Sequence, residues 1–250
     1  MNFRFFHAAL WMNRHQIPAP PDPVLTQEIK HEQAEHQLAR LQKILFIAEQ
    51  ICDENPEALR SYIYLLGRKL QSDFMSRAVS LLDENSMPDL VPKEVWFNEH
   101  GPLTETGEGM YRLIQEVEAS QTMHLQRDLV LPWPWNISRV ISALTNIGEV
   151  RASNAWKQDT SNHRVTVWLP LGIGWIYGGN HSTMAGIVQG AGQLEASTVY
   201  DMSALFKLVR FDGTNFIRTH DGAVISTPVD FEFACIFEVG RLMHKRGINI

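Results

Sequence analysis

The stretch WIYGGNHSTMAGI, residues 175–187, decides the expected fold of this 250-residue chain. The apolar run 173–177 is typical of a buried strand, and it leads directly into two glycines. A short helix is expected over Ser182–Gln189, and Gly190 is placed to end it. A strand that enters a helix through paired glycines favours an α/β arrangement, so we expect this stretch inside a mixed sheet.

Further strands are expected on both sides of this stretch. Branched side chains predict a strand over His163–Leu169 and another over Ser197–Asp201. Two Asp-Gly pairs predict tight turns, so residues 208–226 are expected to form a small antiparallel piece. Together these elements predict a small mixed-sheet α/β (α+β) domain over residues 128–250.

The second half also holds short amphipathic segments that predict helices. The expected helices are Ser138–Ile147 ended by Gly148, Ala204–Val209 capped by Ser203, and a last helix to Arg246 with Thr227 as N-cap and Pro228 in its first turn. Lys245 and Arg246 would favour the C-terminal end of that last helix, where the helix dipole is negative.

The first half, residues 1–127, is predicted to be a helical region. Apolar residues recur at three- and four-residue steps from Thr26, the expected cap, to about Glu54, and again over 57–84. A third helix is expected over 104–127. Residues 85–102 are rich in proline and are expected to connect these helices.

The composition excludes a disordered chain, and the charge balance makes a DNA-binding module less expected. Hydrophobic residues make up 44% of the chain, and the formal net charge is −6. Residues 1–127 carry 12 basic and 18 acidic side chains, and residues 128–250 carry 10 of each, so all of the excess lies in the first half. Neither half has the basic surface that non-specific nucleic-acid binding requires.

Cysteine usage and hydropathy favour a cytoplasmic protein. Cys52 and Cys235 are too few for a disulfide framework, so we expect reduced, buried thiols. The uncharged stretch 165–194 is interrupted by seven glycines and a proline, and its apolar parts are shorter than the ~20 residues of a spanning helix. We therefore expect no membrane segment, and no targeting segment is recognised at Met1.

The glycine loop is the candidate binding site. Gly178 and Gly179 allow a ligand to approach the backbone closely, and the start of the following helix offers N–H groups to a phosphate. His181 is expected to donate a hydrogen bond or to act as acid or base, with Asn180 and Ser182 as further polar groups. The alternative interpretation is a tight turn in which Asn180 or Ser182 only caps the helix.

Two residues elsewhere are candidates for the same site. His163 starts the neighbouring strand and would meet His181 if the two strands pair; Arg139 would reach a phosphate. Two histidines with Asp159 or Asp201 would make a set of nitrogen and oxygen metal ligands. The alternatives are that His163 caps a turn, Asp201 caps a helix and Arg139 forms a surface ion pair.

The order of elements around the glycine loop resembles the ParB/sulfiredoxin-like fold over about residues 129–209. In that family a strand enters a loop that ends in arginine, and a short helix follows; the segment Asn136–Arg139 resembles the family's entry segment. The resemblance implies a phosphate-bearing ligand, such as a nucleotide with Mg²⁺, in a bacterial, plasmid or phage setting. This sequence departs from the family at Ser182, where arginine is usual, and at Asn180, where sulfiredoxin repair needs cysteine.

These observations lead to two functional hypotheses. The first is a ParB-like protein that binds the phosphate of a nucleotide or nucleic acid at residues 178–182, with or without hydrolysis of a phosphate ester. The second is a non-catalytic interaction protein whose acidic helices, residues 26–84, bind a protein partner. Trp133 and Trp135 are next to prolines and are the tryptophans most expected to be partly exposed.

Overall fold

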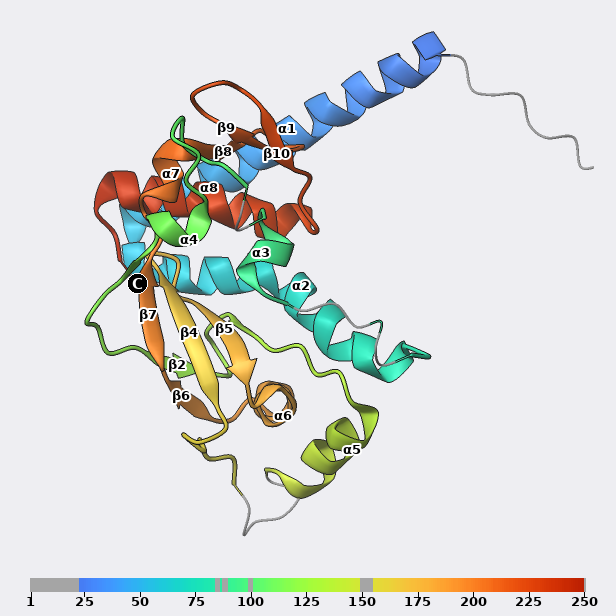
Figure 1. Cartoon of the computed structure of the whole chain (residues 1–250), viewed down its shortest axis with the longest axis vertical. Helices are drawn as coiled ribbons and strands as arrows, with labels where there is room; N and C mark the ends of the chain where they lie inside the picture. The colour runs from blue at the N-terminus through green and yellow to red at the C-terminus, as the bar shows by residue number, and fades with distance from the viewer. Residues whose placement is uncertain (1–22, 84–85, 87–89, 99–100, 149–154, 250) are drawn as a thin grey trace, which may run out of the picture.

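The computed structural model describes residues 23–249 except 84–85, 87–89, 99–100 and 149–154, and it has a layer of helices packed on a mixed sheet (Figure 1). The helical layer contains α1 (Pro23–Glu54), α2 (Leu59–Ser80) and α8 (Phe231–Arg246). A 3₁₀ turn, η1 (Pro56–Ala58), joins α1 to α2. Thr26 lies inside α1 rather than capping it, and α2 ends at Ser80 instead of continuing to residue 84.

The main sheet has five strands in the order β1-β7-β4-β5-β3. The bounds of these strands are β1 Gln115–Glu116, β3 Val130–Leu131, β4 Arg164–Leu169, β5 Ile173–Gly178 and β7 Thr198–Asp201. Strand β5 runs antiparallel to β4 and parallel to β3, while β4 runs parallel to β7. The fold is therefore mixed α/β, as the alternation of strands and helices in the second half predicts.

Two smaller sheets and several short helices complete the described part of the chain. Strands β2 (Thr122–His124) and β6 (Gln193–Glu195) pair with each other, and β8 (Val209–Phe211), β9 (Phe216–Arg218) and β10 (Val224–Ser226) form the expected antiparallel piece. The short helices are α3 (Pro92–Val95), α4 (Met110–Leu113), α5 (Ile137–Asn146), α6 (Asn180–Gln189) and α7 (Leu205–Leu208).

The prediction of a helix over residues 104–127 is wrong. Only α4 is helical there, and β1 and β2 follow it. Both strands pair with distant partners, β7 and β6, which begin beyond residue 190. Hydrogen bonds to those distant strands outweigh the local helical preference, which is worth only a fraction of a kcal/mol per residue.

The predicted starts of three helices are also corrected. The N-cap of α8 is Asp230, whose side chain accepts a hydrogen bond from the Phe233 N–H at 2.8 Å, while Thr227 donates to Asn215 instead. Helix α5 begins one residue early because Asn136 caps it. Helix α7 starts after Ala204 rather than directly after Ser203.

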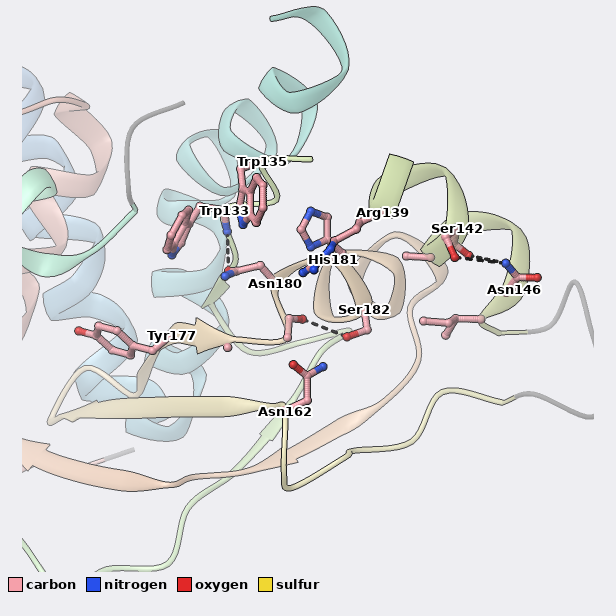
Figure 2. Close-up of a pocket in the computed structure, with 14 residues that line it drawn as sticks. Trp133, Trp135, Arg139, Ser142, Asn146, Asn162, Tyr177, Asn180, His181 and Ser182 are labelled. Carbon is pink, nitrogen blue, oxygen red and sulfur yellow. Dashed lines mark hydrogen bonds between the residues drawn. The ribbon is translucent and has the colours of Figure 1, made fainter. Parts of the chain in front are cut away.

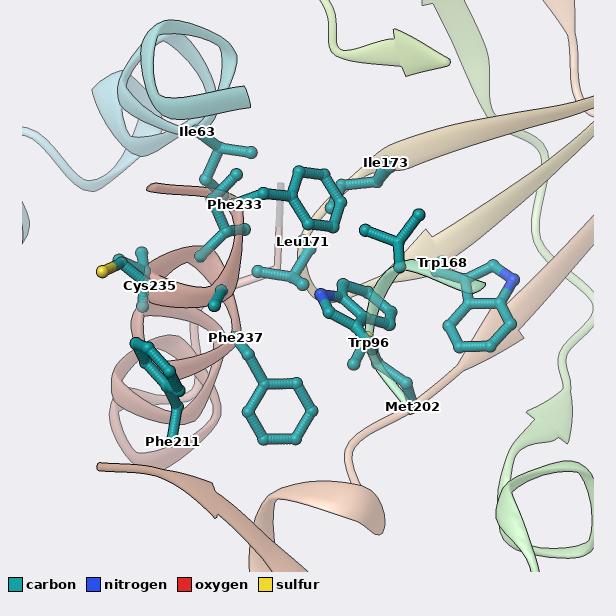
Figure 3. Close-up of a cluster of buried hydrophobic side chains, with 14 of the residues drawn as sticks. Ile63, Trp96, Trp168, Leu171, Ile173, Met202, Phe211, Phe233, Cys235 and Phe237 are labelled. Atoms are coloured by element: carbon teal, nitrogen blue, oxygen red, sulfur yellow. The ribbon is translucent and has the colours of Figure 1, made fainter. Parts of the chain in front are cut away.

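The sheet separates two apolar clusters. Trp168 and Trp175 belong to the larger cluster, which α1, α2 and α8 cover, whereas Val167 and Ile176 belong to the smaller one beside α5 and α6. Figure 3 shows Trp96 in the larger cluster, between α8 and the sheet. Its ring centroid lies 5.4–6.0 Å from those of four partners: Trp168, Trp175, Phe233 and Phe237. This core runs across the expected boundary between residues 127 and 128.

Replacing Phe237 by alanine tests the importance of this core. Phe237 is buried and contacts the rings of Trp96, Phe97, Phe206 and Phe216. We expect Phe237→Ala to lower the free energy of unfolding by about 3–5 kcal/mol, through lost burial and a residual cavity. Urea denaturation measures this change. Phe46→Ala, at an exposed position on α1, is the matched control and should stay near the wild-type value. Equal losses in both variants would contradict the assigned core.

Candidate functional site

The glycine loop joins β5 directly to α6, and its backbone conformation requires glycine. Gly179 is the N-cap of α6 and has φ +76°, in the left-handed region. Helix α6 therefore begins at Asn180, two residues before the expected start at Ser182. It ends at the expected place, with Gly190 at φ +64°.

His163 supports this loop from the neighbouring strand. Its Nδ1 accepts a hydrogen bond from the Asp159 backbone N–H at 2.7 Å, and its Nε2 lies 2.6 Å from Ser182 Oγ. Ser182 Oγ in turn donates to the Gly179 carbonyl oxygen at 3.0 Å. Because Nδ1 must accept, the proton of the neutral ring is on Nε2, which donates to Ser182. We call this chain of hydrogen bonds the His163–Ser182 relay.

The relay favours a positioning role for His163. A histidine that activates a serine must accept the hydroxyl proton at Nε2, whereas here that nitrogen already carries a proton. The ring is buried, and burial lowers the pKa of His163, although the nearby Asp159 carboxylate opposes this effect. This geometry agrees with the alternative interpretation that His163 caps a turn, since His163 closes the turn that starts at Asp159.

A cavity of about 460 Å³ lies on the other side of the loop (Figure 2). The predicted site residues that line it are Arg139, Gly178, Gly179, Asn180, His181 and Ser182. His163 does not line it, although β4 and β5 pair as expected. That side chain instead borders a second cavity of about 320 Å³, which shares only Asn162, Ile147 and Ser182 with the first. The two histidines are therefore brought to opposite sides of the loop.

His181 contacts Asn136 and Trp135 at the wall of the larger cavity. Its Nε2 accepts the Asn136 backbone N–H at 3.1 Å, so the proton of the neutral ring is on Nδ1. Its ring meets the edge of Trp135, with centroids 5.8 Å apart. Arg139 lies over the same Trp135 ring at 5.5 Å. No carboxylate pairs with Arg139 among the described residues, so the expected surface ion pair is not the arrangement observed there.

Asn180 presents a hydrogen-bond donor at the bottom of this cavity. The residue is only 7% exposed, and its Oδ1 accepts the Trp133 backbone N–H at 2.9 Å. Because a backbone N–H only donates, this bond fixes which end of the amide is oxygen. The Nδ2 group then has no hydrogen-bond partner among the described residues, and it remains available to an acceptor in the cavity.

The described lining of the larger cavity contains no aspartate or glutamate. Mg²⁺ prefers carboxylate oxygens, and this lining offers only amide, hydroxyl and carbonyl oxygens. The lining therefore does not fit a protein-held Mg²⁺, and we derive no step through one. The expected metal set is not assembled either: the described residues hold no group of three or more metal-ligating side chains. Asp201 instead accepts the Ser203 N–H at 2.8 Å in the turn before α7, and it does not cap that helix, whose N-cap is Ala204.

Sequence reasoning missed part of the cavity wall. Six further residues with polar or aromatic side chains line it: Trp133, Trp135, Ser142, Asn146, Asn162 and Tyr177. The neighbouring prolines correctly indicated that Trp135 is partly exposed, since this residue is 38% exposed, whereas Trp156, Trp168 and Trp175 are buried. The polar face of α5 gave no sequence signal of a cavity wall, because polar residues on a helix are usually exposed to solvent.

The comparisons with known proteins identify a family. Residues 25–250 match the model of a family described as a family of unknown function, DUF6710. The chain belongs to this family. The match covers the helical layer, the sheet and the glycine loop together. Searches of curated proteins and of solved structures found no match. The resemblance to the ParB/sulfiredoxin-like fold therefore stays a prediction.

Replacing Gly179 by alanine tests the fit between the loop and His163. A Cβ at Gly179 would lie 2.2 Å from His163 Cδ2, whereas a Cβ at Gly190 would meet nothing within 4 Å. Both positions have positive φ, so each variant pays about 1–2 kcal/mol of backbone strain. We expect Gly179→Ala to lose clearly more stability than Gly190→Ala in urea denaturation. Equal losses would show that the ring of His163 does not constrain the loop.

The lowered pKa of His163 predicts a stability loss in mild acid. Below the ordinary histidine pKa of 6.5, the unfolded chain binds a proton at this ring that the folded chain excludes. The free energy of unfolding should therefore fall as the pH decreases from 7 toward 5. His163→Gln cannot titrate, so its stability should depend less on pH over this range. Identical pH dependence of the two proteins, measured by urea denaturation at each pH, would contradict this assignment.

Proposed function

We propose that this DUF6710 protein binds the phosphate of a nucleotide or nucleic acid in the cavity beside residues 178–182. One observation carries the proposal: in a chain of net charge −6, the described lining of this cavity holds an arginine and a histidine but no carboxylate. A cavity of about 460 Å³ is within the usual range for small-molecule sites.

Each polar residue of the lining has a role in this proposal. Arg139 supplies the charge and is preorganised by its stacking on Trp135. His181 donates through Nδ1, and Asn180 donates through Nδ2. The start of α6 adds N–H groups and the positive end of the helix dipole. Gly178 and Gly179 keep side chains away from the ligand, and Ser182 ties the loop to His163.

The geometry favours binding over hydrolysis of a phosphate ester. The Nε2 of His181 is occupied by the Asn136 N–H, and His163 lies behind the loop with its proton directed at Ser182. Neither ring is poised to take a proton from an attacking water.

We place this binding protein in the cytoplasm, because Cys52 and Cys235 are free and buried. No helix within the described residues is long and apolar enough to cross a membrane.

Replacing Arg139 tests the proposed site. We expect Arg139→Gln to weaken nucleotide binding about tenfold or more, because it removes a charge-assisted hydrogen bond from a preorganised site. Arg210→Gln, on the exposed face of β8, is the matched control and should bind as the wild type does. Isothermal titration calorimetry with a panel of nucleoside mono-, di- and triphosphates measures these affinities.

The same titrations are run in Mg²⁺ and in EDTA. Because the described lining lacks carboxylates, binding should persist in EDTA. Strict dependence on Mg²⁺ would contradict the proposed arrangement. No binding by the wild-type protein to any nucleotide, or equal binding by the wild type and Arg139→Gln, would remove the phosphate site.

A protein-interaction role for α1 and α2 is the second candidate function. It is favoured by exposed apolar side chains within residues 26–84: Leu38, Phe46, Leu65 and Val79. Most of the apolar stripe of these helices is, however, buried in the core, for example at Leu41, Ile63 and Leu70. The cavity is therefore the better-supported functional site, and the protein-interaction role remains the second candidate.

A further inference from the structure

We infer that the ligand carries a second phosphate group, which Lys157 binds in the neighbouring cavity of about 320 Å³. The first phosphate lies at Arg139 and the start of α6, so this inference rests on the proposed phosphate site and adds the class of ligand. The ligand chemistry is two phosphates at separate positions of one sugar, which a nucleoside 3′,5′-bisphosphate and a nucleic-acid strand share.

The segment that builds the two cavities is basic, although the chain is acidic. Every residue that lines either cavity lies between the start of β3 and the end of α6, residues 130–189. This segment carries four basic and two acidic side chains, whereas the rest of the chain carries 18 basic and 26 acidic ones. The local excess of positive charge favours an anionic ligand at this part of the surface.

The described cations of this segment have no acidic partner. Arg139 lines the first cavity, Lys157 lines the second, and the Arg164 side chain lies beside Gly178. None of the three forms an ion pair with a described carboxylate. Six arginines elsewhere in the described chain are ion-paired: Arg40, Arg60, Arg127, Arg218, Arg241 and Arg246. One cation in each cavity is therefore available to one phosphate in each.

Lys157 is held at the second cavity by its two neighbours. Trp156 is buried, and its indole Nε1 donates to the Ser182 carbonyl oxygen at 2.6 Å. Gln158 exchanges two hydrogen bonds with the backbone of Glu195: its Nε2 donates to the carbonyl oxygen at 3.1 Å, and its Oε1 accepts the N–H at 2.8 Å. The residues on both sides of Lys157 are therefore anchored to α6 and β6, while its exposed side chain lines the cavity.

The two cavities meet at three uncharged residues, Ile147, Asn162 and Ser182, which line both. In Figure 2, Ser182 lies between Arg139 and Asn162, and the exposed Asn162 amide points toward the loop. A sugar suits this junction, because amide and hydroxyl groups both donate and accept hydrogen bonds. A polyphosphate would instead place a charged phosphate where the described lining offers no cation.

Asp159 is the one carboxylate in the described lining of the second cavity. Its Oδ1 accepts the N–H of Ser161 at 3.0 Å and the hydroxyl of Ser161 at 2.6 Å. Asparagine keeps an oxygen that accepts these bonds but carries no charge. Asp159→Asn should therefore strengthen the binding of a second phosphate severalfold, because it removes a like charge. A ligand amine in this cavity would predict the opposite change.

Isothermal titration calorimetry on the full-length protein tests this inference with pairs of probes: the 5′-monophosphate and the 3′,5′-bisphosphate of each of the four common ribonucleosides. We expect the bisphosphate of at least one nucleoside to bind about tenfold or more tightly than its monophosphate, because the second phosphate binds as a tethered group. The 5′-triphosphate of that nucleoside should bind less tightly than the bisphosphate. A 5′-phosphorylated dinucleotide that matches the bisphosphate in affinity identifies a strand as the source, and a weaker dinucleotide identifies a mononucleotide.

Lys157→Gln locates the second phosphate, and Lys207→Gln is its matched control. Lys207 on α7 is also exposed and has no described acidic partner, but it lines neither cavity. We expect Lys157→Gln to weaken binding of the bisphosphate about tenfold and binding of the monophosphate much less. Lys207→Gln should keep the wild-type preference, whereas Arg139→Gln should weaken the binding of both probes.

The outcomes separate this inference from the proposed phosphate site. Equal affinity for the monophosphates and the bisphosphates, or an unchanged preference in Lys157→Gln, overturns the second phosphate and leaves the first site standing. Weaker binding of the bisphosphate by Asp159→Asn, or tighter binding of the triphosphate than of the bisphosphate, also overturns it. Absence of binding by every probe overturns the phosphate site and, with it, this inference.

Discussion

The burial of Trp96 between α8 and the sheet is the contact on which the rest of the structure depends. Its ring meets Trp168 on β4, Trp175 on β5 and two phenylalanines of α8. Large aromatic side chains bury more apolar area than any others, so this cluster contributes much of the driving force for folding. Because β5 is fixed from this side, the loop that follows it has a defined place at the edge of the sheet.

A second, polar constraint acts on the loop itself. His163 is buried and neutral, and it connects the turn at Asp159 to Ser182 at the start of α6. Gly179 has to be glycine both for its positive φ and for the ring that packs against it. The loop therefore has a rigid back, formed by His163, and an open front, formed by the cavity. This division explains why the two histidines of the sequence pattern serve different purposes.

The proposed function follows from the contrast between the cavity and the rest of the chain. The protein is acidic overall, but the described wall of the cavity excludes carboxylates and presents donors. In the proposed function such a wall selects anions, and the one arginine of the described lining limits the negative charge that it compensates. The membership of the DUF6710 family extends over residues 25–250, so the helical layer and the cavity are parts of one family unit.

The sequence by itself determined the mixed α/β class, the strands around the glycine loop, and most of the residues at the front of the loop. It could do so because strand periodicity, paired glycines and helix-ending glycines are local signals, and residues 178–182 are adjacent in the chain. Only the tertiary structure decided that residues 104–127 form strands, since β1 and β2 are stabilised by partners from beyond residue 190. It likewise decided which side of the loop His163 occupies, that Arg139 stacks on Trp135, and that α5 supplies a polar wall. Those outcomes depend on hydrogen bonds and packing between distant segments, which no local pattern encodes.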